Sequence, residues 1–164
     1  MTESTVLVDV CEKEARLRVN GRATFVFGPD LRELFLRLRK AAVPQVVIEA
    51  DDCVSMDSTF MGVLAMAAIE REGVATAVTI ANPSEKVVGQ LKGLGILRYF
   101  TITERPGTAA HWIPLGDLVS GLKKDEAALR DTMILAHEAL GAANPENVAK
   151  FRQVLELLKQ EKGA

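Results

Sequence analysis

The residues able to take part in chemistry are few in this chain, and one short segment brings several together. A carboxylate and two hydroxyls follow one another at Asp57, Ser58 and Thr59, within the sequence Met-Asp-Ser-Thr-Phe-Met-Gly of residues 56–62. A serine can act as a nucleophile when a base activates it, or it can accept a phosphoryl group from another enzyme. The segment is therefore a candidate either for catalysis or for regulation by phosphorylation.

The other reactive side chains offer little to a catalytic site. The chain has 2 histidines, His111 and His137, which is little material for a multi-histidine metal site or a histidine-centred triad. Cys11 and Cys53 lack Cys-x-x-Cys spacing, so we expect small core residues rather than a disulfide. Ser58 has no Gly-x-Ser-x-Gly elbow, and nothing in the sequence links either histidine to it. The sequence predicts no catalytic residue, no metal and no cofactor.

Strands and helices are predicted to alternate up to residue 103. Apolar or alternating runs predict a hairpin of strands and then further strands, and capping signals with helical spacing predict helices. The expected strands are 5–10, 15–20, a short extended segment at 23–27, 46–48, 75–81 and 99–103, with a turn at Asn20-Gly21. The expected helices begin at Gly28-Pro29-Asp30, at Ser58 and at Asn82, and are ended respectively by Pro44, by Gly73 and before residue 99. This order predicts an α/β fold, a mixed sheet with helices packed against it.

The expected helix after Ser58 is apolar on nearly every side from Phe60 to Ile69, which indicates packing on more than one face. A serine at such a helix start has an ordinary structural role as N-cap, in which its oxygen accepts a hydrogen bond from a backbone N–H two or three residues on. We therefore expect Ser58 to cap this helix, and Asn82 to cap the next one.

The last part of the chain is predicted to form a helical hairpin. Residues 105–121 are expected to be a linker, and residues 122–164 to form the hairpin, interrupted at Asn144-Pro145-Glu146. Apolar residues at helical spacing form two stripes: Leu129, Met133, Ala136 and Leu140, then Val148, Phe151, Leu155 and Leu158. These stripes need a partner, which is the preceding domain, each other, or a second copy in a homodimer.

Composition excludes several classes of function. The 164 residues carry 20 Lys+Arg and 22 Asp+Glu, a formal net charge of -2, which provides no field for gathering nucleic acid or anionic lipid. The longest uncharged stretches, 58–69 and 73–84, are well short of the roughly 20 apolar residues of a membrane-spanning helix. The first residues, Met1-Thr2-Glu3, do not begin a secretory signal. We therefore expect a cytoplasmic protein without membrane insertion.

Residues 56–64 carry a resemblance to a known family. They read Met-Asp-Ser-Thr-Phe-Met-Gly-Val-Leu and follow a predicted buried strand. The segment resembles the helix start of the STAS domain of bacterial anti-sigma factor antagonists, which reads Met-Asp-Ser-Ser/Thr-Gly-Leu-Gly-Val-Leu or similar. Asn82-Pro83-Ser84 at a helix start and Gly93-Leu94 before the last predicted strand also match the family's pattern. The resemblance covers about residues 4–104 and implies a STAS-like domain over residues 1–104.

The resemblance implies a role in transcription regulation without catalysis. By this likeness the unphosphorylated protein binds an anti-sigma factor with a serine-kinase fold; that partner phosphorylates Ser58 and thereby breaks the complex, and a phosphatase restores it. Thr59 is the second candidate acceptor, and residues Asp57, Ser58, Thr59, Phe60 and Met61 would border the partner. A phosphate at a helix N-terminus is tolerated by the helix dipole, so we expect the switch to act at the interface rather than on the fold.

The sequence allows two interpretations of Phe60 and two classes of partner. Phe60-Met61 replaces the family's usual Gly-Leu, and Phe60 is either additional core or an apolar lip on the docking face. A second class of STAS proteins binds an ABC-type transport ATPase without a phosphorylation cycle, and the motif at Asp57-Ser58 suits that class equally well.

Overall fold

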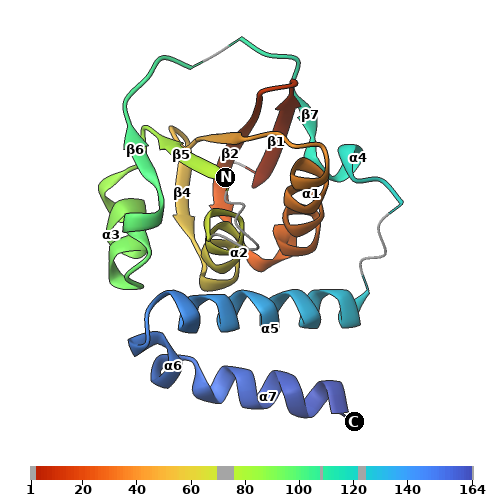
Figure 1. Ribbon diagram of the computed structural model, residues 1–164, viewed down its shortest axis with the longest axis vertical. Coiled ribbons are helices and arrows are strands. Elements are labelled where there is room, and N and C mark those ends of the chain that lie inside the picture. The colour runs from red at the N-terminus through yellow and green to blue at the C-terminus, as the bar shows by residue number, and fades with distance from the viewer. Residues whose placement is uncertain (1–2, 70–75, 108, 122–124, 164) are drawn as a thin grey trace.

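A seven-stranded mixed sheet forms the centre of the molecule. The computed structural model describes residues 3–69, 76–107, 109–121 and 125–163. The strands are β1 (Thr5–Val10), β2 (Glu14–Ala23), β3 (Gln45–Glu49), β4 (Cys53–Met56), β5 (Ala77–Ala81), β6 (Thr101–Thr103) and β7 (Ile113–Pro114). They lie in the order β6-β5-β3-β2-β1-β7, with β4 paired to the end of β2 (Figure 1). Strands β2, β3, β5 and β6 run parallel, and β1 pairs antiparallel with both β2 and β7.

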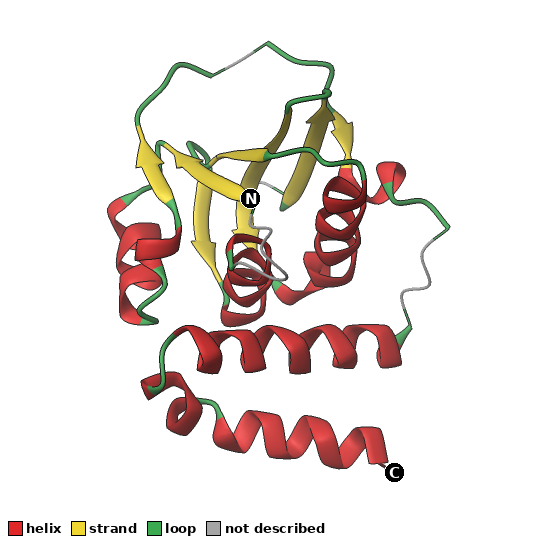
Figure 2. Ribbon diagram, viewed as in Figure 1, coloured by secondary structure: helices red, strands yellow, loops and turns green. Residues whose placement is uncertain are grey.

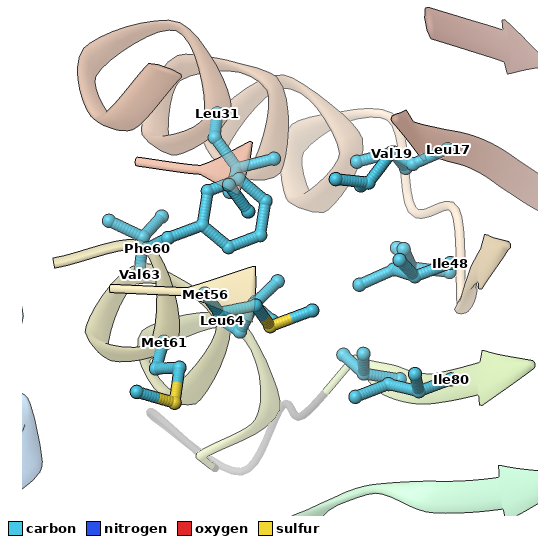
Figure 3. Close-up of a cluster of buried hydrophobic side chains, with 14 of the residues drawn as sticks. Leu17, Val19, Leu31, Ile48, Met56, Phe60, Met61, Val63, Leu64 and Ile80 are labelled. Carbon is cyan, nitrogen blue, oxygen red and sulfur yellow. The ribbon is translucent and has the colours of Figure 1, made fainter. Parts of the chain in front are cut away.

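The core lies between the sheet and the helices that follow its strands. Helix α1 spans Gly28–Lys40, α2 spans Ser58–Ala68 and α3 spans Glu85–Gly93 (labelled in Figure 1; all helices are red in Figure 2). Leu17, Ile48 and Ile80 of three neighbouring strands face the side chains of α1 and α2 and are fully buried (Figure 3). Strand β3 is buried at consecutive positions, and because consecutive side chains point to opposite faces, both faces of the sheet are covered there.

The predicted α/β class is confirmed, with the hairpin, the three helices and the strands after α1 and α2 near the expected places. The predicted turn at Asn20-Gly21 is wrong, because β2 continues through it with a register shift after Gly21. Gly21 has φ +78 and lies against Ser4, where a side chain would clash. Residues 25–27 form the 3-10 helix η1 (Phe25–Phe27) instead of an extended segment. Ser84, rather than Asn82, caps α3 and accepts from the Val87 N–H.

The structure adds two short strands and trims another. Strand β4 precedes α2, and β7 lies within the passage expected to be a linker and pairs with β1. The strand expected at 99–103 begins at Thr101, because residues 97–99 form the 3-10 helix η2 (Leu97–Tyr99). Gly73, expected to end α2, lies outside the described residues. Cys53 is buried as expected, and burial raises the pKa of its thiol to about 11, whereas Cys11 is exposed.

The described residues after β7 form four helices. They are α4 (Leu115–Leu118), α5 (Glu126–Ala143), α6 (Glu146–Lys150) and α7 (Arg152–Gly163). Helix α5 crosses below α1, α2 and α3, and α7 lies against the outer side of α5 (Figure 1). Three ion pairs join α7 to α5: Arg130–Glu161 at 3.5 Å, Lys159–Glu138 at 3.1 Å and Lys162–Asp131 at 3.0 Å. The division into segments 1–104, 105–121 and 122–164 stays a prediction.

The two apolar stripes meet different surroundings. In the first stripe Ala136 and Leu140, both on α5, are fully buried. In the second, Phe151 packs against the core, whereas Val148 is 52% exposed. The structure therefore shows two of the three expected partners. Helix α5 packs on the preceding helices, and α7 packs on α5. Self-association through these helices stays a prediction.

Two kinds of feature are absent from residues 3–69, 76–107, 109–121 and 125–163. No helix there has both the length and the apolar character needed to cross a membrane. Within the same ranges, no group of three or more His, Cys, Asp or Glu side chains is placed to hold a metal ion.

Candidate functional site at the start of helix α2

Asp57 fixes the start of α2 and joins it to η1. It is the N-cap residue, with φ -86 and ψ 172, and its Oδ1 accepts from the Phe60 N–H at 2.8 Å. Its other oxygen, Oδ2, accepts from the Phe25 N–H at 2.6 Å. The expectation that Ser58 caps the helix is wrong, because Asp57 takes this role and Ser58 is the first helical residue. Aspartate and serine are about equally good caps, and therefore residue type alone did not decide between neighbours.

Loss of the Asp57 carboxylate is expected to destabilise the protein. Asp57→Ala removes both acceptors and should lower the free energy of unfolding by about 1–2 kcal/mol. Asp57→Asn should cost less, because an amide oxygen can still accept from the Phe60 N–H while the amide nitrogen cannot accept from Phe25. Urea denaturation followed by circular dichroism measures both variants. Equal stability of Asp57→Ala and the wild type would contradict this role.

Ser58 is hydrogen-bonded to a histidine from the last third of the chain. Its Oγ lies 2.9 Å from Nε2 of His137 on α5, and Nδ1 of the same ring lies 2.7 Å from the Met133 carbonyl oxygen. A carbonyl only accepts, so Nδ1 carries the proton and donates to Met133. In the neutral ring Nε2 then accepts from the Ser58 hydroxyl. With this tautomer the Ser58 hydroxyl donates toward α5.

The His137 ring is buried and is held by contacts with Met133 and Phe151. It is 4% exposed, and its ring meets Phe151 edge to face with 4.9 Å between the centroids. The sequence analysis found no link between Ser58 and a histidine, and the structure corrects this. The available signal was weak: His137 stands four residues after Met133, beside the predicted stripe of α5. The pairing itself spans 79 residues and depends on how α5 crosses α2.

The residues after Ser58 point into the protein. Thr59 is 2%, Phe60 0% and Met61 5% exposed. Phe60 lies in the core near Leu31 of α1 (Figure 3). Of the two interpretations of Phe60, the structure therefore shows additional core, and it presents no apolar lip from Phe60 or Met61.

The exposed apolar side chains near Ser58 come from η1. Phe25 is 40% and Val26 62% exposed, and the backbone of Phe25 is bonded to Asp57. We call Phe25, Val26, Asp57 and Ser58 the Ser58 surface. The sequence analysis missed the two η1 residues because it placed them in an extended segment of the sheet.

Helix α5 approaches α2 closely beside this surface. A Cβ atom added at Gly62 would lie 2.5 Å from the Ala136 carbonyl oxygen and 2.7 Å from the Ala136 Cβ. The glycine therefore allows the two helix backbones to touch one turn after Ser58. The far end of α5 is fixed by Asn147, whose Nδ2 donates to the Leu94 carbonyl at 2.8 Å and to the Leu140 carbonyl at 2.9 Å. Helix α5 thus occupies the side of α2 onto which Ser58 opens.

The chain is similar to known proteins at the level of solved structures. No protein-family model matches the chain, and no curated protein matches it. Among solved structures, the chain resembles the anti-sigma factor antagonist SpoIIAA in its unphosphorylated form, with 18% sequence identity and a TM-score of 0.48. The match covers 62% of this chain and 87% of SpoIIAA. The similarity is one of fold.

Proposed function

We propose that this protein is a non-catalytic binding module that is switched by phosphorylation of Ser58. Without phosphate it binds an anti-sigma factor that has a serine-kinase fold, and through this binding it regulates transcription. The partner transfers phosphate to Ser58 and the complex separates; a phosphatase reverses the step. The observation that carries the proposal is the position of Ser58, the first residue of α2, within the Asp-Ser-Thr motif of residues 57–59.

The chemistry of the switch follows from this position. The Ser58 oxygen attacks the γ-phosphorus of ATP bound by the partner, the bond from that phosphorus to ADP breaks, and the hydroxyl proton passes to a base of the partner. The product carries about -1.5 to -2 charge next to the carboxylate of Asp57. The helix N-terminus tolerates such a charge in water, but burying it against a partner is costly. Thr59 is 2% exposed, which favours Ser58 as the acceptor.

The other exposed residues suit a binding surface. Phe25 and Val26 give the Ser58 surface an apolar part, and aromatic side chains are enriched where proteins dock. Catalysis by Ser58 is a weaker interpretation of its contact with His137. In a catalytic triad a carboxylate orients the histidine, and here Nδ1 of His137 is bonded to the Met133 carbonyl instead.

The proposal is tested by capture of the partner on full-length protein. Ser58→Ala should retain an anti-sigma factor from a lysate of the source cells, and Ser58→Asp should bind the identified partner about a hundredfold less tightly, or not at all. Titration of the purified partner measures both affinities, and mass spectrometry of the wild type locates phosphate. Equal affinity of the two variants would defeat the switch. Recovery of an ABC-type ATPase, with no phosphate at Ser58, would favour the transport class instead.

A further inference from the structure

The contact between Ser58 and His137 bears on how any kinase could reach this serine. Phosphoryl transfer requires the Ser58 oxygen to lie in line with the γ-phosphate of ATP. Ser58 is partly buried, and its Oγ lies 2.9 Å from Nε2 of His137, so α5 covers one side of this oxygen. An in-line approach to this oxygen from the side of α5 therefore requires a form in which the contact is broken. This step rests on the proposed function, in which Ser58 is the acceptor.

The packing between α2 and α5 is close at the Ser58 contact and one turn beyond it. A phosphoryl group adds three oxygens to a serine that already touches the histidine ring. The ring is restrained, because Nδ1 is bonded to Met133 and Phe151 packs against its side. One turn further along α2, Gly62 lies against the backbone of Ala136, so the two helices are closely packed there as well.

Charge acts in the same direction as size. Asp57 adjoins the serine, and its carboxylate is held in place by the Phe25 and Phe60 N–H groups. The charged residues Asp131 and Glu138 of α5 are paired with lysines of α7, on the side of α5 away from α2. Unlike these carboxylates, a protonated His137 would attract a phosphate. Its favourable ion pair would require the phosphate to fit beneath α5, which the packing opposes.

We infer that helix α5 is a built-in competitor for the Ser58 surface, and that docked α5 and phosphorylated Ser58 exclude each other. A partner that buries Ser58 has to displace α5 from the start of α2, and a phosphate on Ser58 prevents α5 from returning. Because such coupling is reciprocal, whatever weakens α5 docking makes phosphorylation of Ser58 more favourable by the same factor. The switch is then conformational as well as interfacial.

Hydrogen exchange of full-length protein tests the exclusion. Phosphoserine is introduced at position 58 during translation, and amide exchange is followed by mass spectrometry with and without the phosphate. The amides of α5 should exchange about tenfold faster or more in the phosphorylated protein, while those of β3 keep their rates. Unchanged or slower exchange of α5, as an ion pair with His137 would cause, overturns the inference. So does an equal rise in β3, because α5 would then be inseparable from the core.

A substitution that pushes α5 away from α2 tests whether α5 can separate from the domain, and it leaves Ser58 and His137 unchanged. Gly62→Ala places a methyl group against Ala136 and should speed exchange of α5 by about tenfold or more. Gly89→Ala is the matched control, a glycine inside helix α3 with no atom within 4 Å of the added Cβ, and it should not speed exchange. Equal exchange of α5 in the two variants, or a general rise that includes β3, contradicts a separable α5.

The outcomes separate this inference from the proposed function. If phosphate leaves α5 docked while Ser58→Asp still loses the partner, the switch stands and the competition fails. If phosphate releases α5 while Ser58→Ala and Ser58→Asp bind the partner equally, the competition stands and the proposed function fails.

Discussion

Replacement of Phe60 by alanine is expected to lower the free energy of unfolding by about 3–5 kcal/mol, the range for deleting a fully buried phenyl ring. Phe60 is 0% exposed and lies in the cluster that joins α2 to α1 and the sheet (Figure 3). The loss combines the transfer of the ring from water with the cavity that remains after its removal. Urea denaturation of the purified variant measures it.

A second phenylalanine provides the control for this measurement. Phe25 is 40% exposed in η1, and Phe25→Ala should cost about 0.5–1 kcal/mol. The same pair also separates the two interpretations of Phe60. Under the core interpretation Phe60→Ala is the more destabilising variant, and Phe25→Ala has the larger effect on partner affinity. A reversed order of the two stabilities would show that Phe60 belongs to the surface.

The second large effect is expected at Asn147, between α5 and the loop after α3. This side chain is 1% exposed and donates to two carbonyls, Leu94 at 2.8 Å and Leu140 at 2.9 Å. Asn147→Ala removes one donor from each carbonyl and opens a small cavity. Leu140 keeps the backbone N–H of Asn144, and Leu94 keeps only the longer contact to the Asn144 amide. The free energy of unfolding should fall by about 2–3 kcal/mol.

A neighbouring asparagine offers a matched comparison. Asn144 reaches the same Leu94 carbonyl, but at 3.4 Å, and is only partly buried. Asn144→Ala should therefore cost about 0.5–1 kcal/mol. Thermal unfolding of both variants by calorimetry tests the ranking. If Asn144→Ala proves the more destabilising, Asn147 is not the residue that fixes the end of α5.

The sequence predicts most of the sheet and its helices, because their signals are local. The buried run Val46 to Ile48 and the spacing of Leu31, Leu34, Phe35 and Leu38 each lie within one element. Strands β4 and β7 were not predicted, because they lack such local signals. They are short, Val54 is 54% exposed, and their pairing partners, β2 and β1, lie far away along the chain. Nothing within such a segment reports a distant partner.

The candidate site divides in the same way. The motif at Asp57-Ser58 was visible as a pattern of adjacent residues, and the choice of cap depended only on which oxygen faces the Phe60 N–H. The contact with His137 required knowledge of which face of α5 meets α2. An apolar stripe predicts that a helix is covered, but it does not say by which surface. Gly62 is informative only once Ala136 is known to lie against it.

The separation of 79 residues between Ser58 and His137 has a consequence during synthesis of the protein. The ribosome adds about 5–20 residues per second, so His137 is translated roughly 4–16 s after Ser58. Strands β1 to β4 and helix α2 have left the peptidyl transferase centre before α5 exists. The nascent chain therefore presents Ser58 without its histidine partner. For those seconds the Ser58 surface has no competitor in its own chain.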